Sequence, residues 1–169
     1  MNLDRAVQQL ENQGKAILAL GRDLSIEQAR WKPGPEDWSI LEVLNHLVDE
    51  EQLDFRRHLD HILYTPQEPW PKITPQDWVI AKKYNLLGLD QTLDNFKSER
   101  EKSIDWLNSL ANPDWNMSIK LSWGKLSAGD MLASWLAHDL LHLRQLTALR
   151  FQLTKSGSAP FNVDYAGKW

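Results

Sequence analysis

Two histidines four residues apart near the C-terminus carry the clearest chemical signal in this sequence. His138 and His142 lie within WLAHDLLHLRQL, an apolar pattern typical of a helix. Because residues at i and i+4 are neighbours on a helix surface, about 5–6 Å apart at Cβ, the two imidazoles can share one metal ion. The pair alone is a weak signal, since buried histidines are often hydrogen-bonded to neighbouring carbonyl groups. A third ligand would have to come from another segment.

His46 offers that third ligand. It lies in WSILEVLNHLVDEE, seven residues after Ser39, and the helical period places its side chain near the edge of the buried stripe of this segment. Three neutral imidazoles from two helices could therefore meet around one ion. Three protein ligands leave one coordination position open, which is typical of catalytic rather than structural metal sites.

Two acidic residues follow His46 by about one turn. Asp49 and Glu50 are candidates for a carboxylate that accepts the second N–H of a ligand imidazole, or for a general base. The alternative is that both belong to the polar flank of the helix. Gln145 and Arg144 could orient a ligand or substrate, although Arg144 could equally bridge to an acid on a neighbouring helix.

The remaining histidines, His58 and His61, are predicted to be surface residues. At 1.5 Å rise per residue they lie about 18 and 22 Å along the helix from His46, too far to join its site. The charged residues Arg56 and Asp60 beside them indicate a solvated stretch.

Composition and charge exclude several classes of function. The chain has no cysteine, so a thiolate zinc site and a cysteine nucleophile are excluded and a metal must be held by nitrogen or oxygen. The net charge of −4 comes without a basic stripe, which argues against a nucleic-acid partner. No apolar run approaches the ~20 residues that span a bilayer, and the N-terminus resembles an amphipathic helix rather than a signal peptide. We therefore expect no membrane partner and a cytoplasmic location.

Hydrophobic spacing, caps and prolines predict an all-α protein of one domain over residues 1–169. Ser39 with Glu42, and Ser127 with Asp130, indicate helix starts, while proline-bearing stretches separate the helices. Four long helices with long connections predict a four-helix bundle with at least one crossover. The predicted elements are long helices at about 2–20, 39–63, 89–111 and 127–153, a short helix at about 75–84, and a short strand over 117–123.

Aromatic residues are expected near the ends of the bundle. Phe161, Tyr165 and Trp169 of the C-terminal tail are predicted to lie back on the bundle or on a second subunit. Trp38, Trp135 or the tail could form the walls of a pocket where the two histidine-bearing helices meet.

Two motifs resemble one known family. Trp31-Lys-Pro-Gly-Pro-Glu-Asp-Trp38-Ser-Ile-Leu-Glu-Val-Leu-Asn-His46-Leu and His138-Asp139-Leu-Leu-His142-Leu-Arg144-Gln145 are similar, in order and separation, to motifs of the DinB-like (DinB/YfiT) superfamily of metal-binding four-helix-bundle proteins. The four-helix pattern that accompanies these motifs spans nearly the whole chain. It implies up-down-down-up topology, a divalent metal ion, zinc or nickel, on His46, His138 and His142, and a homodimer.

The resemblance implies less about activity, because family members include thiol-dependent S-transferases and isomerases, hydrolases and proteins without an assigned activity. The leading hypothesis is a metal-dependent enzyme that activates a low-molecular-weight thiol or water against an electrophilic small molecule, as a transferase or hydrolase. The alternative is a non-catalytic, stress-associated metal-binding bundle or interaction protein. A third possibility is a scaffold without metal whose histidines are hydrogen-bonded core residues; protonation would weaken it below about pH 6.

Overall fold

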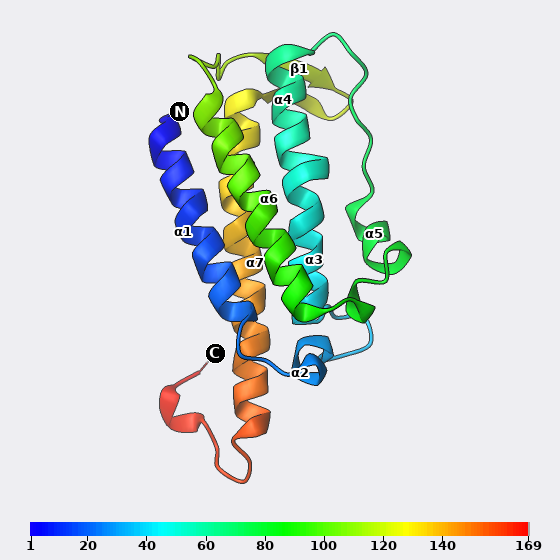
Figure 1. The fold of residues 1–169 in the computed structure, drawn as a ribbon, viewed down its shortest axis with the longest axis vertical. Helices are drawn as coiled ribbons and strands as arrows, with labels where there is room; N and C mark the ends of the chain where they lie inside the picture. Colours follow the sequence, from blue (N-terminus) through cyan, green and yellow to red (C-terminus); the bar gives the residue numbers. More distant parts are fainter. Residues whose placement is uncertain (169) are drawn as a thin grey trace.

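The computed structural model describes residues 1–168 and shows a bundle of four long helical segments (Figure 1). The first and fourth segments run in one direction, and the second and third run in the opposite direction. This is the up-down-down-up order, so the expected fold is confirmed. The segments are α1 (Leu3–Gly21); α3 (Ile40–Asp49), η1 (Glu50–Phe55) and α4 (Arg56–Tyr64) in one continuous rod; α6 (Leu89–Ser109); and α7 (Ala128–Gly157).

Local sequence explains where these helices begin. Ser39 accepts a hydrogen bond from the backbone N–H of Glu42, whose side chain accepts from the backbone N–H of Ser39, and Ser127 and Asp130 repeat this arrangement. Both predicted starts are therefore confirmed. α7 continues beyond the predicted end at about residue 153 and ends at Gly157. Residues 153–156 contain no glycine or proline that would end the helix.

The connections contain short elements. They are α2 (Ile26–Arg30), α5 (Pro75–Ala81), η2 (Tyr84–Leu86), β1 (Ser118–Leu121), β2 (Gly124–Ser127) and η3 (Asp164–Ala166). The strand predicted over 117–123 is present as β1, and it pairs with a second strand that was not predicted, β2, because Gly124 at φ 151° permits a tight turn after Leu121. The short helix predicted to reach residue 84 ends at Ala81, since Lys83 has a left-handed backbone conformation.

The core consists of two hydrophobic clusters separated by a polar layer. The cluster nearest the hairpin includes Leu10, Leu59 and Trp135, and the cluster at the opposite end includes Ile17 and Phe96. Between them, all four long segments place polar side chains in the bundle: Gln13 on α1, His46, Asp49, Glu50 and Glu51 on α3 and η1, Arg100 and Ser103 on α6, and Asp139 on α7. This polar layer contains the candidate site.

The C-terminal tail differs from the prediction in part. Phe161 and Tyr165 are 78% and 106% exposed, so neither packs on the bundle, because the tail leaves α7 at the end away from the hairpin (Figure 1). Trp169 lies outside the described residues. Within residues 1–168, no helix is long and apolar enough to cross a membrane.

Candidate metal centre

Three histidines from α3 and α7 come together inside the polar layer. His46, His138 and His142 each offer a nitrogen atom, and these atoms all lie within 4.8 Å of one another. The Nε2 atoms of His138 and His142 are 3.1 Å apart. The ring centroid of His46 lies 4.9 Å from that of His142 and 5.5 Å from that of His138. The structure thus brings together the three residues that the sequence singled out.

Aromatic rings surround the three histidines. Trp38 meets His46 edge-on at 5.0 Å and is stacked parallel to His142 at 6.5 Å between ring centroids. Phe55 lies 4.9 Å from His138 on the other side. Trp135 is buried and stacks on Phe55 with ring centroids 5.6 Å apart. It therefore supports Phe55, and Phe55 is the ring that contacts His138.

Burial keeps the three imidazoles neutral. Together with the neighbouring histidines, it lowers the pKa of His46 and of His138 to about 3. Burial also lowers the pKa of His142. A neutral imidazole has one nitrogen lone pair, and that lone pair is what binds a metal ion. The centre is therefore in a ligand-competent state at neutral pH.

The spacing of the ring nitrogens tests whether an ion fits these residues. Three imidazoles bound to a tetrahedral zinc ion at 2.0–2.1 Å would place their nitrogens roughly 3.3 Å apart. The 3.1 Å between the Nε2 atoms of His138 and His142 is close to that spacing. The residues present fit a divalent ion.

Gln145 fixes the orientation of one histidine. The Nδ1 of His142 lies 2.9 Å from the side-chain oxygen of Gln145. Because an amide oxygen only accepts, Nδ1 carries the proton and the Nε2 lone pair faces His138. Gln145, predicted to orient a ligand or substrate, therefore orients a histidine directly.

The two acidic residues after His46 have separate environments. The Oε1 of Glu50 lies 3.7 Å from the Nδ1 of His46, and burial raises the pKa of Glu50 to about 9, with contributions from Asp54 and Asp49. Asp49 instead accepts hydrogen bonds from Lys82 and from the Tyr84 hydroxyl, which fasten the α5–η2 connection to α3. Glu50 is thus the carboxyl group beside the histidines, and Asp49 has a structural role.

Asp54 is a residue near the centre that the sequence interpretation missed. It hydrogen-bonds Glu50 and raises the pKa of His46 and His138 electrostatically. Burial would raise the pKa of Asp54, but hydrogen bonds from His58 and Glu50 lower it. The spacing of four between His46, Glu50, Asp54 and His58 is visible in the sequence and could have indicated one polar stripe.

The prediction that His58 and His61 are surface residues is wrong. They are 1% and 6% exposed, because the connection after α4 folds back and covers them with Trp70. His58 is paired with Asp54 and the Pro71 carbonyl, while His61 is within 3.3 Å of the Thr65 hydroxyl. Charged neighbours in sequence do not show which side of a helix a histidine occupies.

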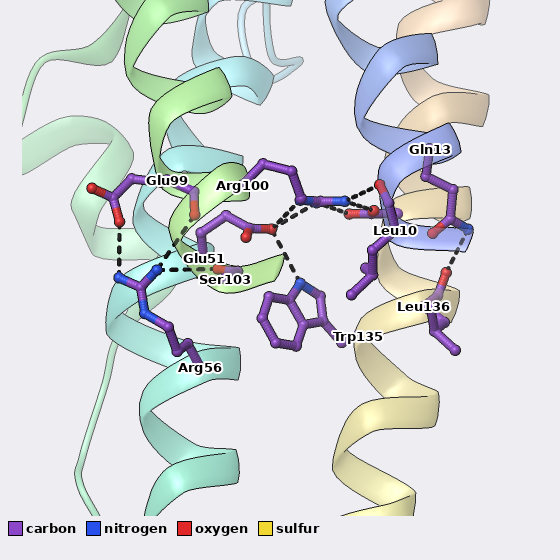
Figure 2. Close-up of polar contacts among 10 residues, drawn as sticks. Leu10, Gln13, Glu51, Arg56, Glu99, Arg100, Ser103, Trp135 and Leu136 are labelled. Carbon is purple, nitrogen blue, oxygen red and sulfur yellow. Dashed lines mark hydrogen bonds and ion pairs between the residues drawn. The ribbon is translucent and has the colours of Figure 1, made fainter. Parts of the chain in front are cut away.

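An ion cluster lies next to the histidines in the same layer. Arg100 of α6 and Trp135 both donate to Glu51 (Figure 2). Arg100 also donates to both oxygens of Asp139. Burial would lower the pKa of Arg100, but Glu51 and Asp139 raise it, so the guanidinium stays charged. Arg144, considered as a partner for an acid on another helix, is exposed and forms no ion pair within residues 1–168.

Comparisons with known proteins agree with this arrangement. The model of the DinB superfamily matches residues 9–146. Among solved structures, YfiT from Bacillus subtilis is similar over 90% of this chain and 87% of its own, with a TM-score of 0.77 and 14% identity; that protein is described as "a probable metal-dependent hydrolase with an unusual four-helix bundle topology". No curated protein matches the sequence. Because the family model covers most of the chain, the protein belongs to the DinB superfamily.

Proposed function

We propose that this protein binds one divalent metal ion, zinc or nickel, through His46, His138 and His142, and uses it in a hydrolase or thiol S-transferase reaction. The observation that carries the proposal is the convergence of three imidazole nitrogens within 4.8 Å of one another, on histidines that burial keeps neutral, beside the carboxyl group of Glu50. The description of YfiT as a metal-dependent hydrolase supports the hydrolytic version.

An ion on three imidazoles keeps an open position, and it would lower the pKa of a water or thiol bound there. The protein's own groups supply the rest of the chemistry. The Nε2 of His142 is held in place by Gln145. Glu50 can exchange a proton with a reacting group, because it holds a proton near neutral pH and adjoins His46.

The site can be approached by a small molecule from the α7 side. A surface pocket of about 480 Å³ borders His142 and includes Leu141 and Ala148. A second pocket of about 280 Å³ is formed by Trp38 with other residues, and the two pockets share Gln145. We propose that an electrophilic small molecule binds there, with water or a low-molecular-weight thiol as its co-substrate.

Metal analysis of the tag-free protein tests this proposal first. We expect about one zinc or nickel ion per chain in the wild type and almost none in His46→Ala or His142→Ala, because two imidazoles hold such an ion weakly. His61→Ala is the matched control, since it removes a buried histidine outside the centre and should keep the metal. A wild-type protein without metal after incubation with either ion would overturn the proposal.

The second candidate function is a non-catalytic metal-binding or interaction protein. The 5% exposure of His46 favours this candidate, because a buried ion between α3 and α7 would hold together the two helices that carry the ligand histidines. Added zinc would then raise the melting temperature by mass action without turnover of any ester, amide or thiol-acceptor substrate. Turnover that is lost in His46→Ala would decide for the enzyme.

We also propose that the protein is a cytoplasmic homodimer that associates through the outer face of α7. Leu140 on that face is 52% exposed and does not line the pocket beside His142. We expect Leu140→Glu to be monomeric in analytical ultracentrifugation, whereas Ile80→Glu, a change at an 82% exposed residue of α5, should leave the dimer intact. A monomeric wild type would contradict this prediction.

A further inference from the structure

A line of polar side chains runs from the histidine centre along the second helical segment. His46, Glu50, Asp54 and His58 follow one another at intervals of four residues. In a regular α-helix, steps of four residues drift by about 40° each around the axis. The π-helical turn η1 (Glu50–Phe55) is wider than an α-turn and offsets this drift, so the four side chains stay on one face. Such π-turns occur frequently at functional sites.

Contacts link each residue of this line to the next. The Nδ1 of His46 lies 3.7 Å from Oε1 of Glu50, and the carboxyl groups of Glu50 and Asp54 hydrogen-bond each other. The Oδ1 of Asp54 is 2.6 Å from the Nδ1 of His58. Two carboxyl groups can share a hydrogen bond only if one of them carries a proton, so a proton lies between Glu50 and Asp54.

The outer end of the line is fixed by the connection after α4. The Nε2 of His58 lies 2.8 Å from the Pro71 carbonyl, which can only accept, so Nε2 carries a proton. The ring of Trp70 stacks on the ring of His58 with centroids 4.0 Å apart. His58 is 1% exposed as a result. A buried histidine with both nitrogens bonded has one orientation, and it holds Asp54 in one orientation.

We propose that Asp54 and His58 are positioning residues of the metal centre, and that the segment 66–74 is coupled to metal binding through them. This inference rests on the proposed metal site. When the segment docks on His58, Asp54 is held against Glu50, and Glu50 is placed to accept the Nδ1–H of His46. His46 then presents its other nitrogen to the ion, as ligand histidines with a hydrogen-bonded second nitrogen do. By linkage, the ion must favour the docked segment as much as the docked segment favours the ion.

Zinc affinity of the metal-depleted protein, measured by competition with a chromophoric chelator, tests the first part. We expect His58→Gln to weaken zinc binding about tenfold, the lower end of the effect of losing a direct partner of a ligand histidine, because His58 acts on His46 through Asp54 and Glu50. His61→Gln is the matched control, because His61 also lies against Trp70, with ring centroids 5.6 Å apart, but has no contact with Asp54. Its affinity should stay within about twofold of the wild type. Equal losses in the two variants would overturn the inference.

Asp54→Ala provides the second variant, and its part-exposed side chain makes misfolding a smaller concern than for His58. We expect the same loss of affinity as in His58→Gln and no further loss in the double variant, because both changes interrupt one line. If the losses of zinc affinity in the two single variants add up in the double variant, Asp54 and His58 do not act through one line of contacts. If His58→Gln does not fold, Asp54→Ala alone decides, and an unchanged zinc affinity in it would overturn the inference.

Trypsin cleavage after the exposed Lys72 tests the coupling. Zinc should slow cleavage at Lys72 in the wild type and in His61→Gln but not in His58→Gln, relative to cleavage after Lys155 near the end of α7. Equal protection by zinc in all three proteins would overturn the coupling. The proposed metal site fails separately, if the wild type binds neither zinc nor nickel.

Discussion

Replacing Arg100 with methionine should lower the free energy of unfolding by about 3–5 kcal/mol, the cost of breaking a buried ion pair by removing one partner. Arg100 is 4% exposed and pairs with Glu51 and Asp139, which are 2% and 1% exposed. Without the guanidinium, two carboxyl groups remain in the polar layer without a cation. Urea denaturation of the metal-free variant beside the wild type measures the loss.

Arg56→Met is the matched control for this prediction. Arg56 also reaches α6, where it pairs with Glu99 and contacts Ser103 (Figure 2), but its side chain is 20% exposed. We expect a loss of about 1 kcal/mol or less there. If Arg100→Met does not fold, adding Glu51→Gln and Asp139→Asn should restore part of the stability, because those changes remove the unpaired charges. Equal losses in the two arginine variants would refute the prediction.

The metal-free protein should lose stability as the pH falls below about 6.5. The folded pKa of His46 and of His138 is about 3, below the unfolded value near 6.5, so the unfolded chain takes up protons first. Each of these two histidines should remove about 2 kcal/mol between pH 6.5 and pH 5. Thermal unfolding across this pH range measures the change, and His142 contributes in the same direction.

Glu50 acts with the opposite sign. Its folded pKa of about 9 lies above the unfolded value, so its contribution is complete below about pH 4.5 and is lost as the pH rises toward 9. Between pH 6.5 and 4.5 the two histidines lower the free energy of unfolding on acidification by more than Glu50 raises it. Below pH 4.5 Glu50 no longer raises it. Glu50→Gln should therefore be more stable than the wild type at pH 8 and lose stability more steeply on acidification. An acid-resistant metal-free protein would contradict the prediction.

The sequence predicts those parts of the molecule that depend on neighbouring residues. The start of α3 at Ser39 and of α7 at Ser127 follows from capping boxes, in which side chain and backbone lie three residues apart. His138 and His142 share a face because a helix places i and i+4 together. These relations depend only on local helix geometry and not on the rest of the chain. The up-down-down-up order of the helices was predicted from the resemblance to the DinB superfamily.

Features that depend on contacts between distant segments could not be predicted. The burial of His58 requires Trp70 from a connection that has no regular hydrophobic period. Arg100 looks like one more charged residue of a solvated helix face until Asp139, 39 residues away, is placed beside it. The π-turn η1 has no residue preference that distinguishes it from an α-helix, so Asp54 was missed together with it.

Adjacent residues in the two histidine-bearing segments serve different centres. Glu50 lies beside the histidines, whereas the next residue, Glu51, binds Arg100; likewise His138 faces the histidine centre and Asp139 faces Arg100. One residue along a helix corresponds to a rotation of about 100°. A single deletion between Ser39 and His46 would therefore turn the later side chains away from both centres at once, even though the composition and helix propensity of the segment would hardly change. Insertions and deletions in these two segments should be tolerated far less than substitutions, whereas the tail and the hairpin carry no such restriction on length.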